Sequence, residues 1–166
     1  MSPPAQLVLM IGAGFVEGYA LGAGQAFALP FRVNRRRFAL LTGFGAALVW
    51  GSVMAMFLAP DPPVLAPLIA VVGLPAIGGA QWLELRRHRP RAHRWIGWTA
   101  LAWTLALPIS FIPGVFVDEA TPLVAHIALW CSGGVAMAAV MAVVTWLGAT
   151  RLAAEPTTEP RARSVT

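Results

Sequence analysis

The hydrophobic residues of this chain gather in five long stretches that short polar connections separate. The stretches cover about residues 6–29, 38–59, 64–85, 95–112 and 120–150. A helix needs about 20 apolar residues to cross the hydrocarbon core of a bilayer, and each stretch is close to that length or longer. The pattern predicts an all-α integral membrane bundle of five transmembrane helices within residues 1–154.

Basic residues occupy alternate connections. All twelve are arginines, and they lie within residues 32–37, within residues 86–94 and from Arg151 onward. The other two connections contain acidic residues and no basic ones. Cytoplasmic loops of membrane proteins carry an excess of basic residues. The alternation therefore predicts a multi-pass protein of the plasma (inner) membrane, with its N-terminus outside and its C-terminus in the cytoplasm.

Composition agrees with this class of protein. Of the 166 residues, 58% are hydrophobic and 11% are charged, whereas a soluble domain carries about a quarter charged residues. Segment 155–166 is polar and contains prolines, so we expect a disordered cytoplasmic tail there. The single cysteine, Cys131, excludes an intrachain disulfide.

The net charge of +5 would suggest nucleic-acid binding in a soluble protein. Here the arginines flank membrane spans, where they set topology and attract anionic lipid headgroups. The expected partners are therefore the lipid bilayer and its anionic headgroups, with no nucleic acid. The arginines expected at the headgroups are Arg35, Arg36, Arg37, Arg86, Arg87, Arg91 and Arg94.

Two helical hairpins in the sequence resemble each other. Residues 22–25 (Gly-Ala-Gly-Gln) correspond to residues 78–81 (Gly-Gly-Ala-Gln), and an arginine-rich connection follows each. Both hairpins would run out–in–out, so the duplication predicts two parallel hairpin repeats related by an axis along the membrane normal. The fifth stretch resembles half of a further unit, with Thr145 at the glutamine position.

The segment Gly78-Gly79-Ala80-Gln81-Trp82-Leu83-Glu84-Leu85-Arg86-Arg87, followed by Trp95 and Thr99, resembles a repeat motif of small bacterial multi-pass membrane proteins. The match is best over the second hairpin and weaker over the first and fifth spans. The resemblance implies a helical bundle, and it brings no catalytic residue because that group has no established activity. Glu84 departs from the motif, at a depth where a carboxylate could already reach the membrane interface.

Glu17 is the only charged residue of the first stretch and lies near its middle. An ionised carboxylate is expensive at that depth, so its side chain should face protein or water. One interpretation is a proton- or cation-binding site. The other is a neutral glutamate that hydrogen-bonds Tyr19, a tryptophan N–H or a threonine of a neighbouring helix.

Small residues recur every four positions on several predicted helices, and a helix brings such positions to one face. Glycines at this spacing let a second helix approach closely. The expected packing glycines are Gly14, Gly18, Gly22, Gly43, Gly51, Gly78 and Gly134. Packing within the chain is the simpler interpretation, and homo-oligomerisation or docking onto another membrane protein is the alternative.

Three further polar residues lie inside predicted spans. Gln25 and Gln81 hold equivalent repeat positions and are expected to form a quasi-symmetric structural pair. His126 is the only histidine within a span, so a haem held by two histidines of one chain lacks its second ligand. Asp118, Glu119 and His126 could form an outer divalent-metal site, but their spacing is not that of a recognised motif. We expect neither a metal nor a cofactor.

Function is the least determined property of the sequence. It contains no P-loop, G-x-S-x-G, H-E-x-x-H or dinucleotide fingerprint, so we predict that the protein is not an enzyme. The leading hypothesis is an accessory or structural subunit that packs on a partner through glycine-rich faces. The alternative is a small transporter or channel component that uses Glu17, and a third is a pigment- or haem-binding subunit that uses His126.

Overall fold

A computed structural model describes the backbone of residues 2–58, 62–118 and 120–154, and the side chains of these residues except 62–72. Its helices are α1 (Pro3–Ala28), α2 (Arg35–Leu58), α3 (Pro62–Leu85), α4 (Arg94–Phe111), the short 3₁₀ helix η1 (Ile112–Val115) and α5 (Leu123–Ala154). The described residues form no strand, so the all-α helical bundle is confirmed. The predicted tail, 155–166, lies outside the described residues.

Four helix boundaries differ by three or more residues from the sequence-based expectation. α1 begins at Pro3 rather than near residue 6, and α5 ends at Ala154 rather than near residue 150. The other two have local reasons. α2 begins at Arg35 rather than near residue 38, because Asn34 Oδ1 accepts the backbone N–H of Arg37 at 3.0 Å and caps the helix. α5 begins at Leu123 rather than near residue 120, directly after Pro122.

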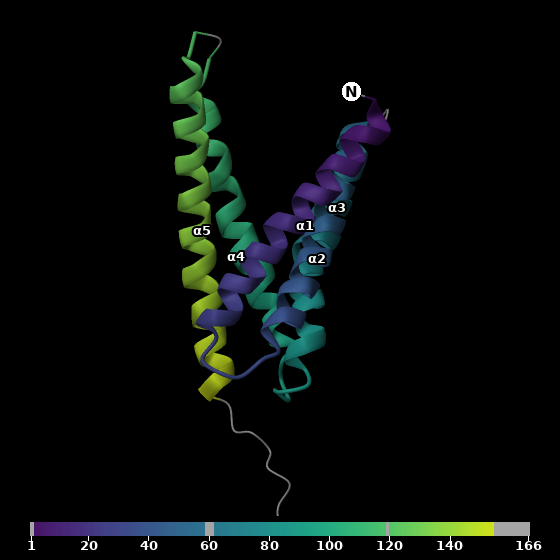
Figure 1. Cartoon of the computed structure of the whole chain (residues 1–166), viewed down its shortest axis with the longest axis vertical. Helices are drawn as coiled ribbons and strands as arrows, with labels where there is room; N and C mark the ends of the chain where they lie inside the picture. The colour runs from purple at the N-terminus through teal and green to yellow at the C-terminus, as the bar shows by residue number, and fades with distance from the viewer. Residues whose placement is uncertain (1, 59–61, 119, 155–166) are drawn as a thin grey trace, which may run out of the picture.

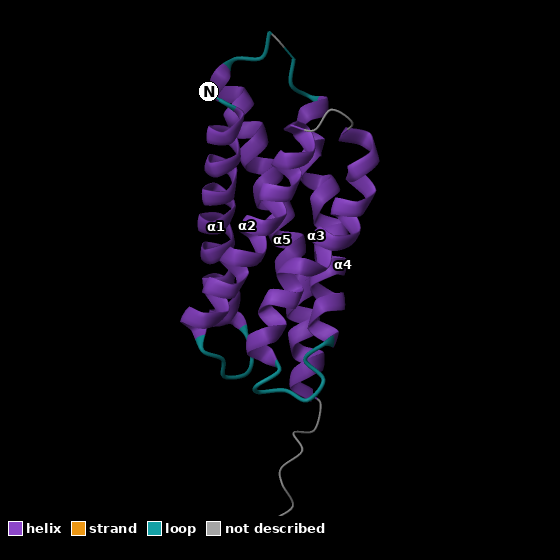
Figure 2. Cartoon of the chain, turned by 90° about the vertical axis from the view of Figure 1, so that its right-hand side faces the viewer, coloured by secondary structure: helices purple, strands orange, loops and turns teal. Residues whose placement is uncertain are grey.

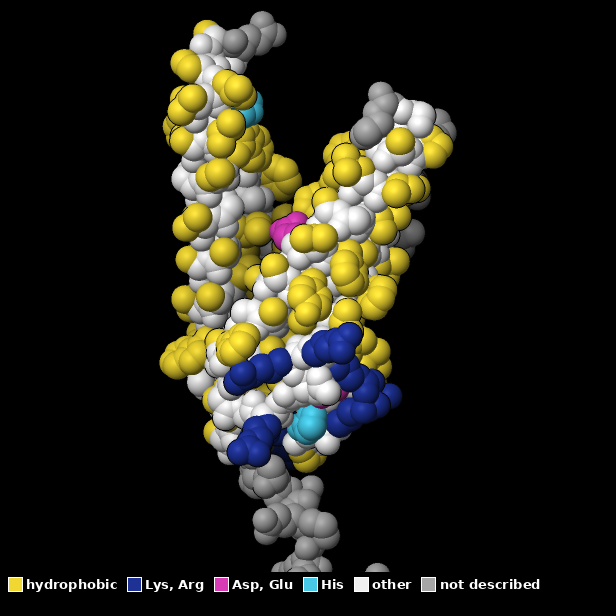
Figure 3. All heavy atoms as spheres, in the orientation of Figure 1, with side chains coloured by type: hydrophobic (Ala, Val, Ile, Leu, Met, Phe, Trp, Pro, Cys, Tyr) yellow, Lys and Arg dark blue, Asp and Glu magenta, His cyan; other side chains and the backbone are white. Residues whose placement is uncertain are grey.

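Four of the described helical segments are long and apolar enough to cross a membrane: α1, α2, α4 together with η1, and α5. Helix α3 has 24 residues and no charged residue before Glu84. Large apolar side chains such as Val16, Phe44 and Val135 are exposed on the outside of the bundle. Figure 3 shows such side chains over the length of the molecule, with arginines confined to one end. These outer faces fit contact with lipid rather than with water.

The helices form two arms that diverge from a common end (Figure 1). The first arm contains α1, α2 and α3, and the second contains α4 and α5. Helix α2 packs on both α1 and α3, α3 also packs on α4, and α4 packs on α5. In the perpendicular view the helices run side by side, so the arms diverge in one direction only (Figure 2).

The core is concentrated at the arginine-rich end, where the arms meet. One buried cluster there draws on all five helices: Ala26, Phe38, Leu85, Trp95, Ala149 and Leu152. A smaller cluster of Ala102, Ala106 and Met141 joins α4 to α5, and Leu21 of α1 packs against it. The bundle is therefore closed at the arginine-rich end and open at the other.

Glycines, which have no side chain, allow α1 to approach α2 closely. A Cβ atom added at Gly18 would lie 2.9 Å from the carbonyl oxygen of Thr42, and one added at Gly22 would lie 3.0 Å from the Cα atom of Ala39. Neither position can hold a side chain without moving α2 away. This contact fixes the face that α1 turns towards α2, and thereby the direction in which Glu17 points.

Candidate functional site: a cleft between the two arms

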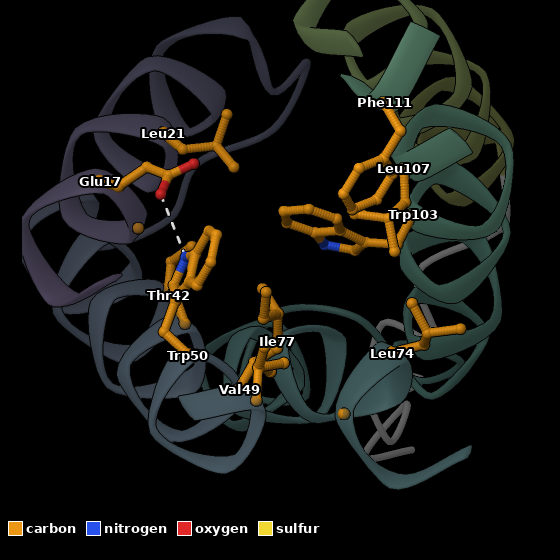
Figure 4. Close-up of a pocket in the computed structure, with 14 residues that line it drawn as sticks. Glu17, Leu21, Thr42, Val49, Trp50, Leu74, Ile77, Trp103, Leu107 and Phe111 are labelled. Atoms are coloured by element: carbon orange, nitrogen blue, oxygen red, sulfur yellow. Dashed lines mark hydrogen bonds between the residues drawn. The ribbon is translucent and has the colours of Figure 1, made fainter. Parts of the chain in front are cut away.

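A cavity of about 160 Å³ lies between the arms, on the open side of the core. Helices α1, α2, α3 and α4 all contribute to its walls, and Glu17 is the only ionisable residue among the described residues that line it. The remaining walls are almost entirely apolar. We call this cavity the cleft; Figure 4 shows it with Glu17 and Trp50 on one side and α4 side chains on the other.

Trp50 of α2 holds the Glu17 carboxylate. Its Nε1 donates a hydrogen bond to Glu17 Oε2 at 3.1 Å (Figure 4). The indole can reach α1 because Gly14 has no side chain: a Cβ atom there would lie 2.8 Å from Trp50 Cβ. A tryptophan N–H was one of the three partners expected for Glu17. Glu17 forms no ion pair with any described residue.

The opposite wall comes from one face of α4. Trp103, Leu107 and Phe111 follow one another at intervals of four residues, and Figure 4 shows them on the same side of the cleft. The Trp103 Nε1 atom is buried and has no hydrogen-bond partner among the described residues. Leaving a buried donor unpaired costs about 1–3 kcal/mol. The cleft therefore holds one unpaired polar atom opposite the carboxylate.

A buried polar network forms the floor of the cleft and begins at Thr42. Gln81 Nε2 donates to Thr42 Oγ1 at 3.1 Å and to Gln25 Oε1 at 2.7 Å. Gln81 Oε1 accepts from Trp95 Nε1 at 2.6 Å and from Thr99 Oγ1 at 3.5 Å. The structure thus brings Gln25 and Gln81 together, as the repeat predicts.

Gln81 is fully satisfied in this network. A glutamine amide has two donor hydrogens and two acceptor positions, and all four are in use in a side chain that is 0% exposed. Its partners lie on α1, α2 and α4. Gln81 therefore ties four helices together directly beneath the cleft.

A buried carboxylate, Glu84, lies one turn beyond Gln81 along α3. Its Oε1 accepts the backbone N–H of Asn34 at 3.0 Å and lies 3.0 Å from His88 Nε2. Its Oε2 lies 3.3 Å from Arg37 Nε. The α1–α2 connection covers Glu84 and leaves it 1% exposed.

Most arginines within residues 32–37 and 86–94 are exposed around the closed end of the bundle. Of the seven expected at headgroups, Arg37 is half-buried by its ion pair with Glu84, and the other six (Arg35, Arg36, Arg86, Arg87, Arg91 and Arg94) are exposed. Arg35 lies 4.2 Å from the centre of the Phe27 ring, and Arg86 lies 4.8 Å from that of Trp82. Such stacking holds the guanidinium at the edge of the apolar surface.

Six of the seven expected packing glycines lie in contacts between helices. Gly14, Gly18, Gly22, Gly43 and Gly51 all lie in the α1–α2 contact, and Gly78 packs against Ile96 and Thr99 of α4. The expectation for Gly134 is wrong: a Cβ atom added there would meet nothing within 4 Å. The α5 glycines in contact are Gly133, against Pro113, and Gly148, against Trp98.

His126 lies apart from the cleft and from the polar network. Its ring is 6.4 Å from that of Trp130, one turn further along α5. No group of three or more His, Cys, Asp or Glu residues in the described part of the chain is placed to hold a metal ion.

Fold and site together define an all-α bundle with four helices able to cross a membrane and an acid-containing cleft between two arms. No protein family, curated protein or solved structure matches this chain.

Proposed function

We propose that the chain is a small transporter, or a component of one, in the plasma membrane, and that the cleft is its solute site. The observation that carries the proposal is the placement of Glu17. It is a carboxylate without an ion-pair partner among the described residues, in an apolar cavity, midway along a helix able to cross a bilayer. Acidic residues placed in this way commonly mark solute or ion paths.

The shape of the bundle supports the same function. Transporters expose a central site to one side at a time, often by rocking one helical group against another. Here the two arms enclose a site that is closed at the arginine-rich end by a core from all five helices. With the arginines in the cytoplasm, as the positive-inside rule requires, the cleft opens outward.

Uptake by purified protein in lipid vesicles tests this proposal. The panel would contain labelled small amines, carboxylates and sugars, compared with protein-free vesicles. We expect at least one solute to enter faster with the wild type. Glu17→Gln should slow that uptake because it removes the charge, and Leu107→Trp should slow it because a larger side chain fills the cleft. The proposal fails if no solute enters faster, or if neither variant changes the rate.

The accessory-subunit hypothesis remains the second candidate, supported by one specific observation. Gly14, Gly18 and Gly22 of α1 already pack against α2, but Ala138 and Ala142 of α5 are exposed and Gly134 has open space beside it. Together they form a small-residue face of the kind that helices pack on in membranes. A stable second protein at fixed ratio after mild-detergent purification, lost in Ala138→Leu, would favour this function over transport.

A further inference from the structure

We infer that the cleft takes a small organic cation: an ammonium compound with an aromatic or alkyl body about one ring in size. This inference rests on the proposed function, whose solute class it names. It depends on the charge, the wall chemistry and the size of the cleft, which are independent of one another.

The single acidic side chain of the cleft indicates the sign of the ligand's charge. Glu17 is the only ionisable residue among the described residues that line the cleft, and its Oε2 accepts the N–H of Trp50. An ionised carboxylate attracts a positive charge that lies close to it, and does so more strongly where the surroundings are apolar. No described side chain supplies one, so a ligand that carries the positive charge itself is favoured.

Wall chemistry gives the type of cation. Trp50, Trp103 and Phe111 contribute aromatic rings to the walls, and leucine, isoleucine and valine side chains contribute most of the rest. A metal ion would find one carboxylate and few other oxygen ligands, which suits neither calcium nor magnesium. An ammonium group with carbon substituents instead gains from aromatic faces and from apolar contact at once.

Size limits the ligand. A cavity of about 160 Å³ is close to the engineered apolar cavity of roughly 150 Å³ that binds benzene. A single ring with a short cationic substituent therefore matches the space between Glu17 and Trp103, with the charged end at α1. Figure 4 shows this space as a gap between the two groups of side chains.

Matched probes of opposite charge provide the test. Benzyltrimethylammonium, benzylsulfonate and benzyl alcohol share the benzyl group and differ in charge. Their affinities would be measured by calorimetry with the full chain in nanodiscs of uncharged lipids. We expect the cation to bind at least tenfold more tightly than the other two probes. Because all three are compared on the wild type, this result does not depend on the folding of a variant.

Two variants then locate the charge that is responsible. Glu17→Gln keeps the length of the side chain and an oxygen that can accept from Trp50, so it should reduce cation affinity about tenfold. Asp118→Asn is the control. Asp118 is an exposed acid outside the spans, and its hydrogen bond from the Thr121 hydroxyl lowers its pKa, so it is charged at neutral pH. Its removal should leave the preference unchanged.

The remaining outcomes distinguish a failure of the cation inference from a failure of the proposed function. If the three probes bind equally well and Leu107→Trp abolishes their binding, the cleft is a solute site and the inference of a cation is wrong. If Glu17→Gln keeps the preference, or Asp118→Asn removes it, the inference is also wrong. If none of the probes binds, the inference fails, and the uptake experiment alone then decides the proposed function.

Discussion

Gln81 is the residue on which most of the buried polar contacts depend. Replacing it by leucine would remove four hydrogen bonds and leave Trp95 Nε1 buried without an acceptor. Hydrogen bonds between transmembrane helices contribute about 0.6 kcal/mol each, and an orphaned buried donor costs about 1–3 kcal/mol. We expect Gln81→Leu to lower the free energy of unfolding by roughly 3–5 kcal/mol, measured by equilibrium unfolding in mixed micelles.

Ser52→Ala is the control for Gln81→Leu. The Ser52 hydroxyl donates only to the carbonyl oxygen of Leu48 in its own helix, at 2.8 Å, so its removal should change stability little. Equal effects of the two substitutions would mean that the network does not hold the helices together.

For single residues, the sequence predicted some of the observed contacts and did not predict others. The Gln25–Gln81 pair was predictable because equivalent repeat positions share one depth. The environment of Glu84 was not, because its partner Asn34 lies 50 residues away in the chain. Local spacing shows that a carboxylate lies near a helix end, but it does not show which loop folds over it.

At the scale of elements, the α1–α2 contact can be tested by adding single methyl groups. Gly18→Ala would place a methyl group 2.9 Å from the Thr42 carbonyl oxygen, and overpacking of this kind costs about 1–3 kcal/mol. Gly24→Ala adds the same methyl group to the same helix, with nothing within 4 Å. It should be neutral, or stabilising by up to ~1 kcal/mol through helix propensity.

Unfolding of both variants in mixed micelles gives the comparison. A loss of stability in Gly18→Ala alone would show that α1 and α2 are in close contact. Similar changes in the two variants would show that the helices are further apart than described.

Helix α5 shows what glycine spacing leaves undetermined. Successive residues of a helix point about 100° apart, so Gly133 and Gly134 lie on different faces. The four-residue period in the sequence selected Gly134, whereas α5 turns Gly133 and Gly148 towards Pro113 and Trp98. Spacing identifies faces that could approach a neighbour closely, and the tertiary fold decides which of these faces does so.

For the molecule as a whole, thiol labelling tests the proposed orientation. Ser2→Cys and Ala153→Cys would each be made in a Cys131→Ser background and treated in intact cells with a membrane-impermeant maleimide. With the arginines in the cytoplasm, position 2 should react at once and position 153 only after permeabilisation. The opposite result would invert the orientation and make the cleft open inward.

The sequence was sufficient to predict the helical class and the concentration of arginine at one end, because both depend on composition along the chain. It did not predict the two arms. Their divergence follows from where the large core side chains meet, and Phe38 and Trp95 make that contact at the arginine-rich end.

The divergence of the arms also gives the protein an asymmetric cross-section within the membrane. In the proposed orientation it occupies more area in the outer leaflet than in the inner one, in the direction that Figure 1 displays. A wedge of this kind relieves packing stress where a bilayer is convex on its outer side. The bundle should therefore concentrate in strongly curved membrane, such as small vesicles or cell poles, and should itself promote such curvature when it is abundant.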